Sequence, residues 1–170
     1  MKKKPAAFLD RDGVINYDFG YIYKFKNFKL RPGVIKGLQL LVKNNYRIFI
    51  VTNQSGIARG LFKVKDVNLL HKKIIKNFKK KQIIISEIKY SPFHIDGVIK
   101  KYSKISKTRK PGNLMIKQIL KKWKIDKKNS FMIGDRVSDK ICAKSSNLYF
   151  QYAKKNFYLQ IKNILKLKVI

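Results

Sequence analysis

Short apolar runs alternate along this chain with longer segments in which apolar residues recur at helical spacing. Five runs are rich in β-branched and aromatic residues, which favours strands: 6–9, 46–51, 83–90, 131–133 and 148–152. Five other segments carry one apolar face, which predicts helices: one that starts at Pro32-Gly33, then 64–80, 113–123, 139–146 and 159–167. Strands that alternate with helices predict an α/β fold, a doubly wound, mostly parallel, Rossmann-like sheet with helices on both faces.

The chain has enough apolar material for one packed core, because 45% of its 170 residues are hydrophobic. We therefore expect residues 1–170 to form a single domain without a large cap domain. No apolar run approaches the roughly 20 residues that span a bilayer, and the basic start at 2–4 is followed by only a short apolar run, 6–9, which argues against a signal peptide. The single cysteine, Cys142, excludes an internal disulfide and a cysteine-based zinc cage. We expect a cytoplasmic protein with no membrane partner.

The charge of the chain is strongly unbalanced, since 41 Lys and Arg stand against 9 Asp and Glu and leave a net charge of +32. A field of this sign attracts polyanions such as nucleic acids. However, the lysines are spread over the whole chain, and arginine, the residue best suited to bidentate phosphate and base contacts, is scarce. We therefore interpret the charge as compositional drift and do not expect a nucleic-acid partner.

Acidic residues are rare here, yet four of them form two pairs that each follow a predicted strand. Asp10 and Asp12 come after the first strand, and Asp135 and Asp139 come after the fourth. Because ligands bind outside the carboxyl ends of parallel strands, both pairs should meet at one edge of the sheet. An isolated aspartate after a strand is often a turn or a helix cap. Four in matching places favour a site, and a hard cation such as Mg²⁺, held by oxygen ligands, explains why mutually repelling carboxylates are grouped.

Two further segments carry groups that suit phosphate. A third strand end bears Thr52-Asn53-Gln54-Ser55-Gly56, whose hydroxyl and N–H groups could hold a phosphate oxygen. A long loop that starts at Ser91 ends in Arg109-Lys110-Pro111-Gly112. In so basic a chain the Arg-Lys pair is informative only because it stands at a loop-to-helix junction.

The four segments, in this order, resemble the four motifs of the haloacid dehalogenase superfamily, and the match runs from Asp10 to about Ala143. Two runs are more specific, Asp18-Phe19-Gly20-Tyr21 and 52–60 (TNQSGIARG). They resemble the D-glycero-D-manno-heptose 1,7-bisphosphate phosphatases and the related histidinol-phosphate phosphatases. The resemblance implies a monomeric, Mg²⁺-dependent phosphatase that removes the C7 phosphate of the heptose bisphosphate through an aspartyl-phosphate, with a small phosphorylated sugar as its partner.

The resemblance also implies a role for each matching residue. Asp10 would attack phosphorus, and Asp12 would protonate the leaving oxygen and then activate water. Thr52 and Lys110 would bind the oxygens of the transferred phosphoryl group. Mg²⁺ would be held by Asp10, the backbone carbonyl of Asp12, and Asp135, while Asp139 would orient Lys110 or support the metal. Substrate contacts would come from Asp18, Gly20, Tyr21, Asn53, Gln54, Ser55 and Arg109.

The chain departs from the zinc-bearing members of these families in its long loop. Where they carry Cys-x-His and Cys-x-Cys, this chain has residues that are not the usual zinc ligands: Ser91, Phe93, Ser106 and Thr108. We therefore expect no structural zinc. The loop should instead be ordered by the substrate or by aromatic and proline packing from Tyr90, Pro92, Phe93 and Tyr102.

Three other functions stay open. A histidinol-phosphate phosphatase would share the chemistry and differ in the leaving group. A phosphatase of nucleic-acid 3′ ends would use the positive surface, although the chain shows no evident groove of aromatic and arginine residues. A basic binding module with an inactive phosphatase fold is disfavoured because all the motif residues are present.

Four residues with distinctive side chains have simpler interpretations. Cys142 and Trp123 are expected in the core. His71, beside two lysines, is expected to be exposed, and His94 to be a surface or packing residue.

Overall fold

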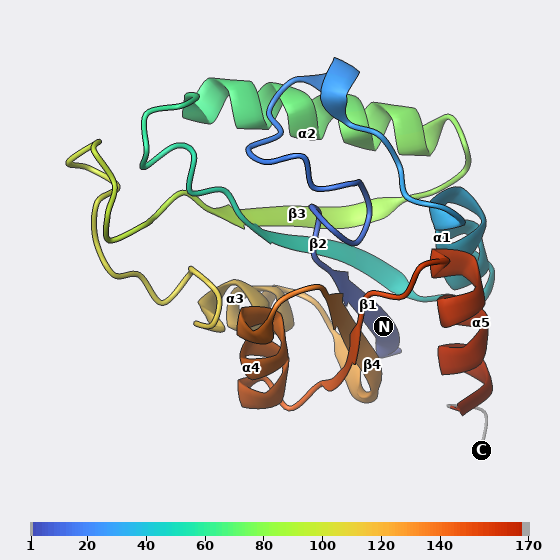
Figure 1. The fold of residues 1–170 in the computed structure, drawn as a ribbon. Coiled ribbons are helices and arrows are strands. Elements are labelled where there is room, and N and C mark those ends of the chain that lie inside the picture. Colours follow the sequence, from blue (N-terminus) through green and yellow to red (C-terminus); the bar gives the residue numbers. More distant parts are fainter. Residues whose placement is uncertain (1, 168–170) are drawn as a thin grey trace.

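The computed structural model describes residues 2–167, in which five strands form one parallel sheet (Figure 1). The strand order is β3-β2-β1-β4-β5. The strands are β1 (Lys4–Leu9), β2 (Arg47–Asn53), β3 (Ile85–Ser91), β4 (Ile125–Gly134) and β5 (Tyr149–Tyr152). The doubly wound α/β fold predicted from the sequence is confirmed.

Helices cover both faces of the sheet, as Figure 1 shows. One face packs against α1 (Val34–Lys43), α2 (Val64–Lys79) and α5 (Phe157–Leu167), and the other against α3 (Leu114–Lys122) and α4 (Val137–Ser145). A short 3-10 helix, η1 (Phe25–Asn27), lies between β1 and α1. In β1 the side chains alternate between the two cores, Ala7 and Leu9 toward the first and Ala6 and Phe8 toward the second. Both faces of the strand are therefore buried, which is why it appears in the sequence as a continuous apolar run.

Several element boundaries differ from those predicted, and the largest difference is at the start of β4. Strand β4 starts at Ile125, six residues before the predicted 131. Residues 126–130 are all polar, and Ile125 and Asp126 pair with Lys4 and Pro5 in the sheet. A register shift between Pro5 and Ala7 accommodates this early part of β4. Helix α4 starts at Val137 because Asp139 is its third residue and accepts the backbone N–H of Arg136 at 3.1 Å, in a capping arrangement. Helix α5 likewise starts two residues early, at 157.

The strand order places the predicted motifs next to one another. Strand β1 lies at the centre, with β2 on one side and β4 on the other, so the chain reverses its winding direction at β1. Ligands of open α/β sheets bind at such a switch point, outside the carboxyl ends of the strands. Within residues 2–167 no helix is long and apolar enough to cross a membrane.

Candidate active site

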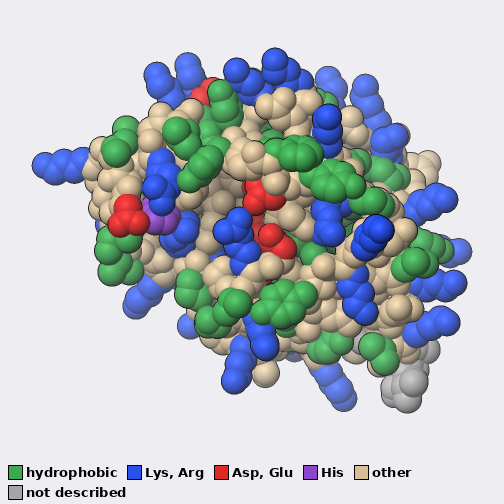
Figure 2. All heavy atoms as spheres, in the orientation of Figure 1, with side chains coloured by type: hydrophobic (Ala, Val, Ile, Leu, Met, Phe, Trp, Pro, Cys, Tyr) green, Lys and Arg blue, Asp and Glu red, His purple; other side chains and the backbone are tan. Residues whose placement is uncertain are grey.

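A cavity of about 520 Å³ opens at the carboxyl edge of the sheet. Figure 2 shows acidic side chains in a hollow near the middle of this face, with Lys and Arg spread around the outline. The cavity is lined by twelve of the thirteen predicted site residues, Asp10, Asp12, Asp18, Gly20, Tyr21, Thr52, Asn53, Gln54, Ser55, Arg109, Lys110 and Asp139. The thirteenth, Asp135, has a carboxylate oxygen within 4.8 Å of those of Asp10 and Asp139. The structure therefore brings the whole predicted set together.

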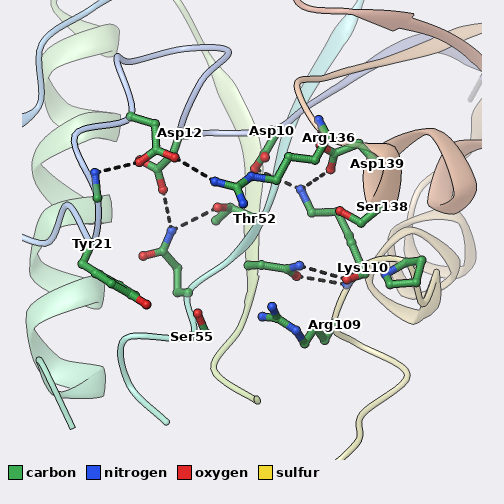
Figure 3. A pocket seen from close by; sticks show the side chains of 15 residues that line it. Asp10, Asp12, Tyr21, Thr52, Ser55, Arg109, Lys110, Arg136, Ser138 and Asp139 are labelled. Atoms are coloured by element: carbon green, nitrogen blue, oxygen red, sulfur yellow. Dashed lines mark hydrogen bonds and ion pairs between the residues drawn. The ribbon is translucent and has the colours of Figure 1, made fainter. Parts of the chain in front are cut away.

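Lys110 is the buried cation at the centre of this cavity (Figure 3). Its Nζ lies 3.0 Å from Asp10 Oδ1 and 2.6 Å from Asp139 Oδ1, and it donates to the Val51 carbonyl at 2.9 Å. Burial alone would lower the pKa of Lys110, but the charges of Asp10 and Asp139 outweigh it and raise the pKa. The ammonium group therefore stays charged at neutral pH.

Asp10 stands at the carboxyl end of β1 and is only 7% exposed. Its Oδ1 accepts the backbone N–H of Arg11 at 2.7 Å in addition to its contact with Lys110. Burial raises the pKa of Asp10 to about 7, because the opposing charge of Lys110 only partly offsets desolvation and the charges of Asp139 and Asp12 raise the pKa further. Asp10 is therefore a carboxyl group whose ionisation depends on what else occupies the cavity.

Asp10, Asp135 and Asp139 form a cluster that fits a hard divalent cation. One carboxylate oxygen from each lies within 4.8 Å of the others, and an all-oxygen donor set of this charge suits Mg²⁺. Burial and then the charge of Asp139 raise the pKa of Asp135, so the cluster is strained by its own repulsion. Glycine at position 13 suits this place, because its φ is +81° and an added Cβ would overlap the carboxylate of Asp135. The presence of Asp139 in this cluster goes beyond the supporting role expected from the sequence.

Asp12 is held by four N–H donors. Its Oδ1 accepts from Arg11 Nε at 3.1 Å and from Asn16 Nδ2 at 2.8 Å. Its Oδ2 accepts from Arg11 Nη2 and from Gln54 Nε2, both at 2.8 Å. Gln54 Nε2 also donates to Thr52 Oγ1 at 3.1 Å. The carboxylate of Asp12 is thus fixed from the ends of both β1 and β2.

Asn53 fastens the segment that carries Lys110 to the end of β2. Its Nδ2 donates to the Lys110 carbonyl and its Oδ1 accepts the Lys110 N–H, each at 3.0 Å. Both ends of the amide are used, so in this structure Asn53 positions Lys110. The family resemblance instead implies that Asn53 contacts substrate.

The more exposed part of the cavity carries arginines. Arg136 Nη2 lies 3.1 Å from Asp18 Oδ2, and Arg136 and Ser138 line the cavity although the sequence analysis did not single them out. Their place between the two aspartates of the fourth motif was the available signal. Burial, followed by the positive charges of Arg59 and Arg136, lowers the pKa of Arg109. The positive potential of these neighbouring arginines would favour the binding of an anion.

His71 is buried, which corrects the expectation that it is exposed. It is 6% exposed, and its Nε2 lies 3.1 Å from Nη1 of Arg11, which is itself fully buried. Burial and then the charge of Arg11 lower the pKa of His71 to about 3, so the imidazole is neutral and accepts this hydrogen bond. The signal in the sequence was its spacing from Val67 and Ile74, which places it on the apolar stripe of α2.

The long loop between β3 and α3 is held by hydroxyl groups and aromatic rings. Thr108 Oγ1 lies 3.0 Å from Ser91 Oγ and 2.8 Å from Ser106 Oγ, at three positions where zinc-bearing relatives have cysteine. The rings of Phe93 and Tyr102, expected to pack in this loop, have centroids 5.9 Å apart. The absence of a structural zinc stays a prediction.

The three other residues with simple interpretations are placed as follows. Trp123, expected in the core, is partly buried and packs against it. Cys142 is 1% exposed, which confirms its assignment to the core. His94 contacts Arg59 Nη2 at 3.2 Å and Asp96, so it packs within the loop.

Comparison with known proteins identifies the family of this chain. The family model described as polynucleotide kinase 3 phosphatase matches residues 16–164. The D-glycero-β-D-manno-heptose-1,7-bisphosphate 7-phosphatase of Rhodopseudomonas palustris is 36% identical over 164 residues, which cover 96% of this chain and 91% of that protein. The D-glycero-α-D-manno-heptose-1,7-bisphosphate 7-phosphatase of Photorhabdus laumondii subsp. laumondii is 41% identical over 137 residues, covering 81% of this chain and 75% of that protein.

A solved structure shares the fold. The D,D-heptose 1,7-bisphosphate phosphatase from B. bronchiseptica, crystallised with magnesium and phosphate, superposes with a TM-score of 0.83 at 21% identity, covering 96% of this chain and 99% of that one. Sequence relatives, family model and fold therefore agree. The chain belongs to the polynucleotide kinase 3 phosphatase family within the haloacid dehalogenase superfamily of phosphoric monoester hydrolases.

Proposed function

We propose that this protein hydrolyses the C7 phosphate of D-glycero-D-manno-heptose 1,7-bisphosphate through an aspartyl-phosphate. The observation that carries the proposal is the charge that lines the cavity. The buried Lys110 bridges Asp10 and Asp139, and two further cations that are more exposed, Arg109 and Arg136, line the same cavity. A substrate with two phosphates suits a cavity that offers cations beyond the one that Asp10 and Asp139 hold. The curated relatives are named as 7-phosphatases of such a sugar, which supports the same substrate.

Asp10 is the proposed nucleophile. Lys110 and the N–H of Arg11 both engage Oδ1, so Oδ2 is the oxygen that we propose attacks phosphorus. As the new P–O bond forms, the bond from phosphorus to the sugar oxygen breaks. Asp12, in its protonated form, gives its proton to that leaving oxygen, and as carboxylate it then takes a proton from the water that cleaves the aspartyl-phosphate. Inorganic phosphate leaves, and Asp10 and Asp12 return to their starting states.

The remaining polar groups bind the transferred phosphoryl oxygens. Thr52 Oγ1 and Lys110 Nζ line the same end of the cavity and supply a hydroxyl donor and a positive charge. Lys110 is already fixed by Asp139 and the Val51 carbonyl, so it needs little reorganisation when charge develops on the phosphoryl group. This preorganised charge is the main electrostatic contribution of the chain to the proposed reaction.

Mg²⁺ is the cofactor that these residues fit. Asp10, Asp135 and Asp139 offer the carboxylate oxygens, and the carbonyl of Asp12 is the further ligand that we propose. When bound, the ion would neutralise negative charge, so that an anionic nucleophile can approach an anionic phosphate. We propose this assignment together with the activity.

The experiment measures phosphate release with Mg²⁺ from both anomers of heptose 1,7-bisphosphate, heptose 7-phosphate, histidinol phosphate and a 3′-phosphorylated oligonucleotide. We expect the highest kcat/KM with one heptose bisphosphate and no turnover by Asp10→Asn. Arg109→Gln should raise KM for the bisphosphate more than for the 7-phosphate. Arg47→Gln is the matched control, because Arg47 stacks on Trp123, its guanidinium carbon 4.6 Å from the ring centroid, and does not line the cavity.

Other outcomes would identify a different function. Preference for histidinol phosphate or for the oligonucleotide would keep the chemistry and replace the substrate. Preference for the oligonucleotide would also mean that the +32 charge serves binding. Failure to hydrolyse any of these esters would refute the proposed activity.

A further inference from the structure

Arg11, which lies between the two aspartates of the first motif, is the hub of a buried network. Its side chain is fully buried, and its Nε and Nη2 hold the two carboxylate oxygens of Asp12. Nη2 also donates to the Ile22 carbonyl at 2.7 Å and to Gln54 Oε1 at 3.1 Å. The proposed mechanism assigns no step to this arginine, although it touches the proposed general acid at both oxygens.

The remaining guanidinium nitrogen of Arg11, Nη1, donates a hydrogen bond to His71. This nitrogen lies 3.1 Å from His71 Nε2, and the imidazole is placed edge-on to the ring of Tyr90, with ring centroids 5.5 Å apart and an interplanar angle of 66°. Tyr90 in turn donates its hydroxyl to Asn68 on α2 at 2.9 Å. His71 is therefore fixed by α2 and β3, two elements that carry none of the proposed catalytic groups.

The chemistry of the acceptors distinguishes this network from an ordinary buried ion pair. Apart from Asp12, every partner of the Arg11 guanidinium is neutral: the Ile22 carbonyl, the Gln54 amide oxygen and the imidazole. An acidic residue in place of His71 would draw the guanidinium toward a second negative charge. A neutral acceptor instead fixes its orientation and, among residues 2–167, leaves Asp12 as the one acidic side chain that it contacts.

We propose that His71 and Arg11 are positioning residues for Asp12. His71 fixes the plane of the Arg11 guanidinium, and the guanidinium fixes the orientation of the Asp12 carboxyl group. The inference rests on the proposed function, in which Asp12 exchanges a proton with the leaving oxygen. Proton transfer requires hydrogen-bond reach and alignment, so a carboxyl group held at both oxygens is delivered in one orientation. Removing the acceptor leaves the buried Nη1 without its partner and takes away one of the five hydrogen bonds that orient the guanidinium, so Asp12 is aligned less exactly.

The test compares leaving groups. An alkyl phosphate such as the sugar phosphate needs its leaving oxygen protonated, whereas p-nitrophenol leaves readily without a proton. We expect His71→Phe to lower kcat for the sugar phosphate about ten- to hundredfold with KM little changed. The rate constant of the pre-steady-state burst of p-nitrophenol from p-nitrophenyl phosphate should change less than about twofold. The burst reports formation of the aspartyl-phosphate, which needs no general acid when the leaving group is p-nitrophenol. His71→Gln, which keeps an acceptor oxygen, should recover most of the lost rate.

A purely structural role for His71 predicts something else. It would lower turnover of both substrates together, and this outcome would overturn the proposal. Ile74→Ala is the matched control, because Ile74 is buried on the same helix and packs in the core with a side chain that has no hydrogen-bonding group. It should lower the melting temperature without changing the ratio of the two rates.

A second measurement determines the tautomer of His71 in the wild-type protein, so it does not require a variant at position 71 to fold. The chain has two histidines, and nitrogen chemical shifts report the tautomer of each, with His94→Gln assigning the signals. We expect His71 in the wild-type protein to stay a neutral ring with its proton on Nδ1 between about pH 5 and pH 8. An Nε2–H tautomer or a protonated ring would overturn the proposal. Absence of phosphatase activity in the wild type with an intact Nδ1–H tautomer would instead refute the proposed function alone.

Discussion

The raised pKa of Asp10 predicts how the free energy of unfolding depends on pH, and this prediction does not depend on catalysis. In the folded protein burial raises its pKa to about 7, from an ordinary value of 3.8. Between these values the folded protein holds a proton that the unfolded chain has released, so folding becomes less favourable as pH rises from about 4 to about 7. A difference of about 3 pKa units lowers the free energy of unfolding by on the order of 4 kcal/mol. This destabilisation is complete above about pH 7 and absent near pH 4.

Asp10→Asn removes this ionisation while keeping the shape of the side chain. Without metal, the variant should therefore be more stable than the wild type at pH 8, by on the order of 4 kcal/mol, and about equally stable near pH 4. For a chain of this length such a difference is a rise in melting temperature on the order of 10 °C. Lys110 keeps its contacts with Asp139 and the Val51 carbonyl in the variant, so its charge stays paired.

Unfolding by urea in EDTA, at several values between about pH 4.5 and pH 8, measures this difference. Trp123 is the single tryptophan and serves as the fluorescence reporter, with its ring 5.6 Å from that of Phe49 in the core. Mg²⁺ at about one hundred times its dissociation constant should stabilise the wild type by about 2.7 kcal/mol and the variant much less. Equal stabilities at pH 8, or a difference that does not change with pH, would refute the reasoning that burial controls Asp10.

Three further substitutions test the site and the loop. Lys110→Met strands the two carboxylates that the lysine bridges, so we expect a loss of about 3–5 kcal/mol in the free energy of unfolding at pH 7 and loss of phosphatase activity. Gly13→Ala drives a methyl group against Asp135 and should abolish the stabilisation by Mg²⁺, whereas Gly20→Ala, with a similar φ and open space, should keep it. Thr108→Val removes the hydroxyl shared by two serines and should cost about 1–3 kcal/mol, measured by urea unfolding; an unchanged midpoint would show that the aromatic rings alone hold the loop.

The fold could be predicted because the local patterns and the topology agree. Strand β1 is buried on both faces and appears as an unbroken apolar run, and each helix presents one apolar stripe. The start of β4 could not be predicted, because 126–130 are all polar. This part of the strand joins the sheet through the pairing of Ile125 and Asp126 with Lys4 and Pro5, and through Ser130 Oγ, which accepts the Ala6 N–H. Backbone pairing of this kind leaves little trace in the side chains.

The sequence predicts which residues gather at the site, because the carboxyl ends of parallel strands lie at one edge of the sheet. It does not predict the hydrogen-bond and ion-pair partners of these residues, because the partners depend on side-chain directions that packing decides. Asn53 faces the backbone of Lys110, and Asp139 contacts Lys110 while also joining the metal-binding cluster. His71 was misjudged because its lysine neighbours in sequence outweighed its position on the apolar stripe of α2.

The charge of the whole chain and the charge of the site act over different distances. Five of the nine acidic residues lie at the cavity, namely Asp10, Asp12, Asp18, Asp135 and Asp139. At physiological ionic strength exposed charges more than about 8 Å apart are largely screened, whereas buried pairs are screened much less. The potential that a metal ion meets in the cavity is therefore set by these carboxylates together with Lys110, Arg109 and Arg136, and the exposed lysines act mainly on an approaching anionic substrate. Added salt should accordingly slow substrate association while leaving the affinity for Mg²⁺ less affected.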